Sequence, residues 1–184
     1  KLKQWGYYNG SIDGIYGTDT FEAVKRFQRK HGLKADGVVG SSTAAALGIQ
    51  FKSTTSDNYQ ASRGGNIDRG DIHTLARAVH AEARGEPYVG KVAVAAVILN
   101  RVKHSSFPNT IAGVVYQPGA FTAVFDGQIN LSPDNESLRA ATDAMNGWDP
   151  TGGAIYYYNP AKSTSSWIWS RPVITVIGDH RFAR

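Results

Sequence analysis

Glu82 occupies a position at which the pattern of a buried helix predicts an apolar side chain. If residues 72–84 form a helix, Leu75, Val79 and Glu82 follow one another at i, i+4 and i+7, and this spacing places them on one face. A carboxylate at the end of an apolar stripe loses hydration, and desolvation favours its protonated form. General-acid catalysis requires a carboxylic acid that keeps its proton near neutral pH. Glu82 is therefore the first candidate for a catalytic residue.

A structural role is the alternative for Glu82, since ion pairs within a fold also bury carboxylates. The side chain could pair with Arg84 or Arg101, or it could cap a neighbouring turn. Glu86 returns to the same helical stripe by its spacing, but it stands between a glycine and a proline, so the helix is expected to have ended there.

The elements that must position these residues are mainly helical. Helices are predicted at residues 72–84, 90–103 and about 134–146. The run 92–99 is apolar on every side, which indicates a helix that is buried on all faces. The run 172–177 predicts one short strand.

Aromatic and amide side chains follow in the loops of the second half of the chain. Aromatic rings stack on the apolar faces of sugars, whereas amides and hydroxyls meet sugar hydroxyl and acetamido groups. Filling of a small core is the alternative. Three successive tyrosines in one extended segment cannot all face inward, so we expect at least one to be exposed. Contact with a ligand is favoured for Tyr157, Tyr158 and Asn159.

An internal repeat organises the first 48 residues. Segments 13–24 and 36–47 share the pattern D-G-x-x-G-x-x-T-x-x-A-[VL], which predicts a glycine-rich turn that leads into a helix. Thr18 and Ser41 are the predicted N-caps. Phe21, Val24, Phe27 and Gln28 continue a helical stripe, and Gly32 marks its end. Residues 49–69 are rich in Ser, Thr, Asn and Gly, a composition typical of a linker.

Composition excludes several classes of function. The absence of cysteine excludes disulfides, thiolate catalysis and cysteine-ligated zinc. The net charge of +5 favours polyanionic surroundings, but the basic residues are scattered, so no nucleic-acid partner is expected. His73 and His80 lie seven residues apart and would make an incomplete zinc set, so a metallopeptidase or amidase is a rival with little support. Neither a metal nor a cofactor is expected.

Together with the segments 5–10 and 26–28, the repeat resembles the peptidoglycan-binding domain type 1 module. The first helix that is usual for this module is reduced to residues 1–5, so residues 1–48 are expected to form a truncated peptidoglycan-binding domain. The chain begins at Lys1 rather than at a methionine, and we expect it to be a trimmed piece.

Residues 70–184 resemble the catalytic domain of spore cortex-lytic enzymes of the SleB/CwlJ cell-wall-hydrolase type. The resemblance is carried by segments 81–86, 93–101, 107–111, 148–154, 158–160 and 169–172. A binding module in first place matches SleB better than CwlJ. The resemblance implies an α+β fold that is mainly helical, with a lysozyme-like catalytic domain.

The resemblance also implies a function. The family is considered to cleave the glycan strand of spore cortex as a lytic transglycosylase in germination, leaving a 1,6-anhydromuramic end. Its catalytic Glu corresponds to Glu82, and its Tyr-Asn signature corresponds to Tyr158 and Asn159. Substrate contacts by Tyr157, Phe121, Thr122 and Gln128 are our extension. The family resemblance further implies a place in the spore cortex or cell wall, peptidoglycan as the partner, and an accessory protein of the YpeB kind. We also expect the chain to be exported and monomeric.

Counting carboxylates favours this mechanism over hydrolysis. Glycosidases that add water usually employ two carboxylates, whereas a transglycosylase needs one. Further acids exist, namely Glu86, Asp126, Asp149 and Asp179, and Asp149 precedes a proline as a turn residue does. A hydrolytic muramidase and a non-enzymatic peptidoglycan-binding protein therefore stay open as alternatives.

Overall fold

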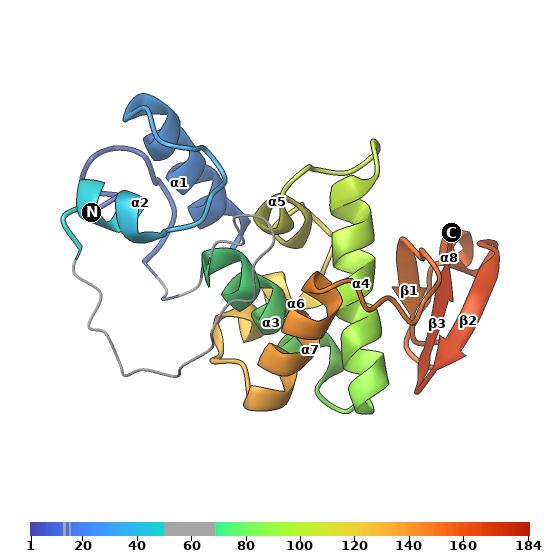
Figure 1. Ribbon diagram of the computed structural model, residues 1–184. Coiled ribbons are helices and arrows are strands. Elements are labelled where there is room, and N and C mark those ends of the chain that lie inside the picture. Colours follow the sequence, from blue (N-terminus) through green and yellow to red (C-terminus); the bar gives the residue numbers. More distant parts are fainter. Residues whose placement is uncertain (13, 15, 50–68) are drawn as a thin grey trace.

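The computed structural model describes residues 1–12, 14, 16–49 and 69–184 (Figure 1). Asp13 of the first repeat and residues 50–68 of the predicted linker lie outside the described residues. Helices dominate, as expected, and the elements are α1 (Thr18–Lys30), α2 (Ser41–Ala46), α3 (Arg69–Ala83), α4 (Tyr88–Lys103), α5 (Ile111–Val115), α6 (Thr122–Phe125), the 3-10 turn η1 (Gln128–Asn130), α7 (Asn135–Met145), β1 (Tyr156–Tyr158), α8 (Ser166–Trp169), β2 (Val173–Ile177) and β3 (His180–Ala183). No helix in the described ranges has the length and apolar character needed to cross a membrane.

Helix α4 is buried on all sides because two layers enclose it. It stands between α3, α5 and α7 on one side and the small sheet on the other (Figure 1). Every residue from Gly90 to Ile98 is buried. Val94 and Ile98 join the main core with Leu75 and Val79 of α3. Ala93 and Val97 instead pack with Ala154 and Phe182. The prediction from the run 92–99 is confirmed.

The sheet contains three antiparallel strands in the order β1-β3-β2. The predicted strand at 172–177 is confirmed as β2, but β1 and β3 were not predicted. Both are too short to show an alternating pattern, with three and four residues. They form because β2 and β3 pair across a tight turn at residues 178–179, after which β3 pairs with β1, setting Phe182 opposite Tyr157.

Helix α1 confirms the predicted stripe in the N-terminal module, which is the name used below for residues 1–48. Phe21, Val24, Phe27 and Gln28 are buried. The predicted N-caps are wrong by one position, since Gly17 and Gly40 precede the helices and the chain is already helical at Thr18 and Ser41. The hydroxyl of Thr18 lies instead 3.5 Å from the carbonyl oxygen of Tyr116.

Gln28 holds the turn of the second repeat in place. Its side-chain amide donates to the carboxylate of Asp36 at 2.9 Å and to the hydroxyl of Thr43 at 3.1 Å. Its carbonyl oxygen accepts from the backbone N–H of Gly37 at 2.8 Å. A buried amide costs free energy unless it is hydrogen-bonded, and here the repeat itself supplies the partners.

The N-terminal module packs directly on the part of the chain that follows. The ring of Phe21 stacks on Tyr116, with ring centroids 5.1 Å apart and the planes 25° from parallel. The backbone N–H of Tyr16 donates to the side-chain oxygen of Asn130 at 2.9 Å. Phe21 therefore belongs to the same core cluster as Leu75 and Val94.

Candidate active site

Glu82 lies in the last turn of α3 and is held by two other elements. Leu75 and Val79 are fully buried on the same face, whereas Glu82 is only half-buried. The hydroxyl of Tyr157 in β1 donates to Oε2 of Glu82 at 3.2 Å. The backbone N–H of Ala123 in α6 donates to Oε1 at 3.3 Å. The apolar stripe of α3 therefore leads to Glu82 as predicted, and the Glu82 side chain remains partly accessible to solvent.

The surroundings of Glu82 favour its protonated form. Burial raises the pKa of this carboxyl above its usual value, and the negative charge of Asp126 acts in the same direction. The hydrogen bonds from Ala123 and Tyr157 and the positive charge of Arg101 oppose the rise in pKa only in part. A raised pKa moves the carboxyl toward the range in which it donates a proton near neutral pH.

Arg101 acts on Glu82 through its charge and forms no ion pair with it within 4 Å. Its Nε donates to the carbonyl oxygen of Ile155 at 2.7 Å. Its guanidinium carbon lies 5.4 Å from the ring centre of Phe121 and 5.8 Å from that of Tyr156. Burial lowers the pKa of Arg101. Tyr157, Tyr156 and the carboxylate of Glu82 act in the opposite direction and offset part of this lowering. From the sequence, Arg101 was expected only as a possible ion-pair partner of Glu82.

The structural alternatives for Glu82 hold only in part. The structure gives Glu82 no ion pair within 4 Å to Arg84 or Arg101, and Arg84 is exposed. Glu82 does cap a neighbouring turn, because its carboxylate accepts from the backbone N–H of Ala123, the second residue of α6. Capping uses one carboxylate oxygen, and the other meets Tyr157.

The three tyrosines of β1 point to opposite faces of the strand, as successive residues do. Tyr157 contacts Glu82, whereas the rings of Tyr156 and Tyr158 pack on Trp167 and Trp169 of α8. The expectation that at least one tyrosine is exposed is wrong. Tyr156 and Tyr157 are half-buried and Tyr158 is 6% exposed, because α8 covers the second face.

The remaining predicted contact residues lie at different places. Phe121 is buried directly before α6, and Thr122 is exposed, so both directly precede Ala123, whose N–H contacts Glu82. Gln128 is exposed and donates through Nε2 to Asp126 at 3.0 Å. The side-chain oxygen of Asn159 accepts from the N–H of Ala161 within a turn.

The other acids differ in their availability. Asp126 is exposed and near enough for its charge to act on Glu82. Asp149 is a turn residue, as predicted, since its carboxylate accepts from Thr151, Asn100 and Gly153. Partial burial opposes these hydrogen bonds, yet they hold the pKa of Asp149 below its usual value. Glu86 is occupied by His180 and by the backbone N–H of Asp179.

The two histidines of α3 do not converge on a common site. Nδ1 of His80 lies 3.2 Å from Oδ2 of Asp134, and His73 is exposed. Within the part of the chain that the structure describes, no three His, Asp or Glu side chains form a group that could hold a metal ion.

Both parts of the chain match known protein families. Residues 85–183 match the family described as Cell Wall Hydrolase, and residues 1–47 match a peptidoglycan binding domain. Glu82 lies just before the first match, whereas Glu86, Tyr157 and His180 lie within it. The spore cortex-lytic enzyme of Bacillus cereus is 45% identical over 210 residues, which cover all of this chain and 80% of that protein.

Further relatives agree with the order of the two parts. The spore cortex-lytic enzyme of Bacillus subtilis is 38% identical over 99% of this chain and 83% of its own length. The cell wall hydrolase CwlJ of the same organism is 29% identical over only 61% of this chain and 83% of its own length. The solved catalytic domain of the germination-specific lytic transglycosylase SleB from Bacillus anthracis is 56% identical, with a TM-score of 0.63 over 66% of this chain and all of that domain. The chain therefore belongs to the Cell Wall Hydrolase family, among the spore cortex-lytic enzymes.

Proposed function

We propose that the chain is a lytic transglycosylase that cleaves the glycan strand of spore-cortex peptidoglycan, between muramic acid and N-acetylglucosamine, during germination. The observation that carries the proposal is a half-buried carboxyl, Glu82, whose pKa is raised by burial and whose two oxygens meet a tyrosine hydroxyl and a backbone N–H. The names of the relatives support the substrate, since they are spore cortex-lytic enzymes and a germination-specific lytic transglycosylase.

The proposed reaction needs one carboxyl group. Glu82 in its protonated form donates its proton to the glycosidic oxygen, and the bond from that oxygen to muramic C1 breaks. The resulting carboxylate then removes the proton from the muramic C6 hydroxyl, and that oxygen attacks C1. The proton thus returns to Glu82, no water is consumed, and the product ends in a 1,6-anhydro ring.

Several neighbours are proposed to serve this reaction. Tyr157 orients the carboxyl, and the positive charge of Arg101 lowers the cost of ionising it after the first proton transfer. Thr122 is exposed and directly precedes the residue whose N–H contacts Glu82, where it can meet a sugar, and Phe121 before it is buried. For Tyr158, Asn159 and Gln128, contact with the substrate stays a prediction.

Hydrolysis by a muramidase is the second candidate, and Asp126 is the observation that favours it. This carboxylate is exposed and lies near enough for its charge to raise the pKa of Glu82. An inverting glycosidase would use such a second carboxylate to activate water. In that case the released muramic ends would be reducing and heavier by one water than the anhydro form.

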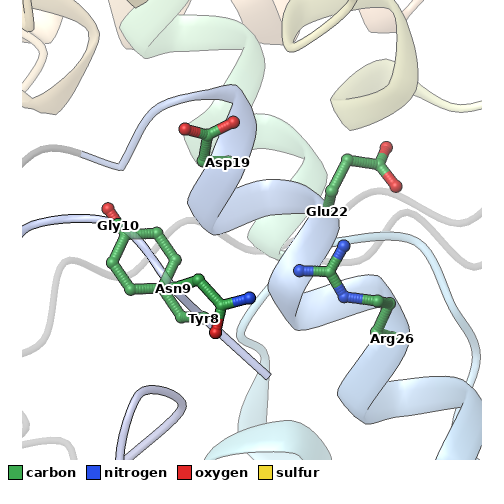
Figure 2. A pocket seen from close by; sticks show the side chains of 6 residues that line it. All are labelled: Tyr8, Asn9, Gly10, Asp19, Glu22 and Arg26. Carbon is green, nitrogen blue, oxygen red and sulfur yellow. The ribbon is translucent and has the colours of Figure 1, made fainter. Parts of the chain in front are cut away.

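The N-terminal module is proposed to bind peptidoglycan, and the chain is proposed to divide into residues 1–48, a linker at 49–69 and a catalytic domain at 70–184. The module carries a hollow of about 190 Å³, lined by Tyr8, Asn9, Gly10, Asp19, Glu22 and Arg26 (Figure 2). A ring, an amide and charged groups of both signs suit sugars and peptide stems.

Export to the cortex or cell wall, a monomeric state and a partner of the YpeB kind stay predictions.

Digestion of cortex peptidoglycan followed by mass spectrometry tests the proposal. The native chain should release anhydro-muropeptides, and Glu82→Gln should lose at least about 100-fold in rate, the lower range of general-acid contributions. Glu82→Gln should still bind the cortex, whereas a protein that only binds would be unaffected. Asp126→Asn should keep most of the activity. Reducing ends alone, together with an inactive Asp126→Asn, would establish the muramidase instead.

A further inference from the structure

Glu86 and His180 form a buried pair that the proposed reaction does not use. Glu86 lies in the connection between α3 and α4, and its side chain is 7% exposed. Its Oε1 lies 3.1 Å from Nδ1 of His180, in a contact whose direction departs from that of a straight hydrogen bond. Burial lowers the pKa of His180, which favours its neutral form. Oε2 of Glu86 accepts from the backbone N–H of Asp179 at 3.1 Å. One carboxylate therefore ties the start of α4 to the hairpin of β2 and β3.

The backbone of the hairpin approaches this carboxylate as closely as glycine permits. Gly178 has a φ of +57°, and a Cβ added there would lie 1.9 Å from Oε2 of Glu86. A side chain at this position would have to displace the carboxylate. The turn at residues 178–179 is thus shaped around Glu86.

The pair reaches the candidate active site through one aromatic ring. His180 meets Tyr157 edge-to-face, with ring centroids 5.2 Å apart and the planes at 82°. The hydroxyl at the far end of Tyr157 donates to Oε2 of Glu82. Phe182 also contacts the Tyr157 ring, at 6.0 Å. The contacts therefore run from Glu86 to His180, then to Tyr157, and end at Glu82.

We propose that Glu86 and His180 are positioning residues for the reaction of Glu82, because together they hold the ring of Tyr157 at the angle from which its hydroxyl meets the catalytic carboxyl. The inference rests on the proposed function of that carboxyl. The two acids of the segment 82–86 thereby have different tasks: the first exchanges the proton, and the second orients the tyrosine that contacts the first.

The pKa of Glu82 provides a readout that a merely structural role would not move. The groups that act on this pKa are Tyr157, the N–H of Ala123, Asp126 and Arg101. Loss of the Tyr157 hydrogen bond removes a contact that favours the charged carboxylate, so the pKa of Glu82 should rise. Glu86→Ala and His180→Ala should therefore raise the pKa of Glu82 in the unliganded chain, as Tyr157→Phe does. Carboxyl-carbon NMR titration measures it directly.

Kinetics on cortex fragments gives the second measurement. Misplacement of Tyr157 should lower kcat about tenfold in Glu86→Ala and His180→Ala and leave KM within about twofold, because substrate contacts are kept. Glu86→Gln should restore part of the loss, since its amide oxygen still accepts from Asp179. Combined with Tyr157→Phe, Glu86→Ala should add little, because both changes remove the same contact.

The control is Glu136→Ala, which removes the carboxylate that pairs with Lys91 on α4 and does not touch Tyr157. It should leave the pKa of Glu82 and kcat unchanged. An unaltered pKa of Glu82 in a folded Glu86→Ala chain, or effects of Glu86→Ala and Tyr157→Phe that simply add, would overturn the proposal. If alanine at 86 prevents folding, Glu86→Gln and His180→Phe carry the same comparison. The titration needs no turnover, so it separates this proposal from the proposed function, which fails if Glu82→Gln stays active.

Discussion

The hydroxyl of Tyr157 donates a hydrogen bond to Oε2 of Glu82 across a separation of 75 residues in the chain. One end of this contact belongs to a helix and the other to a three-residue strand. The contact sets the proton affinity of the carboxyl from one side, while Asp126 and Arg101 act on it through their charges.

Replacing Glu82 by Gln should stabilise the chain near neutral pH. A carboxyl whose pKa is raised in the folded state binds its proton more readily there than in the unfolded chain, so stability falls as pH rises through the raised pKa. Because the Gln side chain carries no charge that burial could desolvate, the stability of Glu82→Gln does not fall for this reason in this pH range. Urea unfolding between about pH 4 and pH 8 should show the advantage of Glu82→Gln at the upper end and its decline toward the usual pKa of glutamate.

Glu22→Gln is the matched control, since it makes the same chemical change on the surface of α1. If both variants respond to pH alike, the stability difference does not come from burial of Glu82.

Tyr157→Phe should extend activity to higher pH while lowering its maximum. The lost hydrogen bond favours the charged carboxylate, so the pKa of Glu82 rises further and the acid keeps its proton to a higher pH. A rate lower by about tenfold is expected from poorer orientation of the carboxyl. The pH profile of kcat/KM on cortex fragments measures both effects.

Tyr88→Phe serves as the control for this change. Tyr88 begins α4, and its hydroxyl donates to Asp143 of α7. It is not among the groups that act on the pKa of Glu82. A basic limb that stays in place in Tyr157→Phe would contradict the assignment of Glu82 as the acid.

Gly178→Ala should destabilise the chain by about 2–4 kcal/mol, because strain at positive φ adds to a steric overlap with Oε2 of Glu86. Gly152→Ala is the matched control, with a φ of +67° but an ordinary contact distance of 3.7 Å from its added Cβ to Ile174. It should cost about 1 kcal/mol. Chemical unfolding measures the free energy of unfolding of both variants. Equal losses would mean that the carboxylate of Glu86 moves aside without a measurable loss of stability.

Phe21→Ala should destabilise the N-terminal module and the part of the chain that it touches. The change removes the ring stacked on Tyr116 and should cost about 3 kcal/mol. Hydrogen exchange of α5, which ends next to Tyr116, should accelerate. Phe27→Ala removes a fully buried ring that packs with Trp5 and Tyr7 within the module, and it should leave α5 protected. Equal protection of α5 in both variants would show that the two parts unfold independently.

Much of the helical architecture follows from local patterns. The stripe of Leu75 and Val79 and the apolar run of α4 predicted two helices because burial imposes a period on side chains that a sequence displays. The strand at 173–177 was visible for a different reason, its run of β-branched residues, because most of its side chains are exposed. The strands β1 and β3 were not visible, since short strands depend on partners far away in the chain.

Local patterns alone place Glu82 at the end of an apolar stripe and show that aromatic residues follow in the last third of the chain. Which tyrosine meets Glu82 depends on how the elements pack: the alternation of β1 turns Tyr157 toward Glu82 and turns Tyr156 and Tyr158 toward α8. The pairing of Glu86 with His180 likewise depends on a hairpin that closes 93 residues beyond this glutamate. Local patterns report which face of an element is buried, whereas contacts between such faces arise only when the elements pack together.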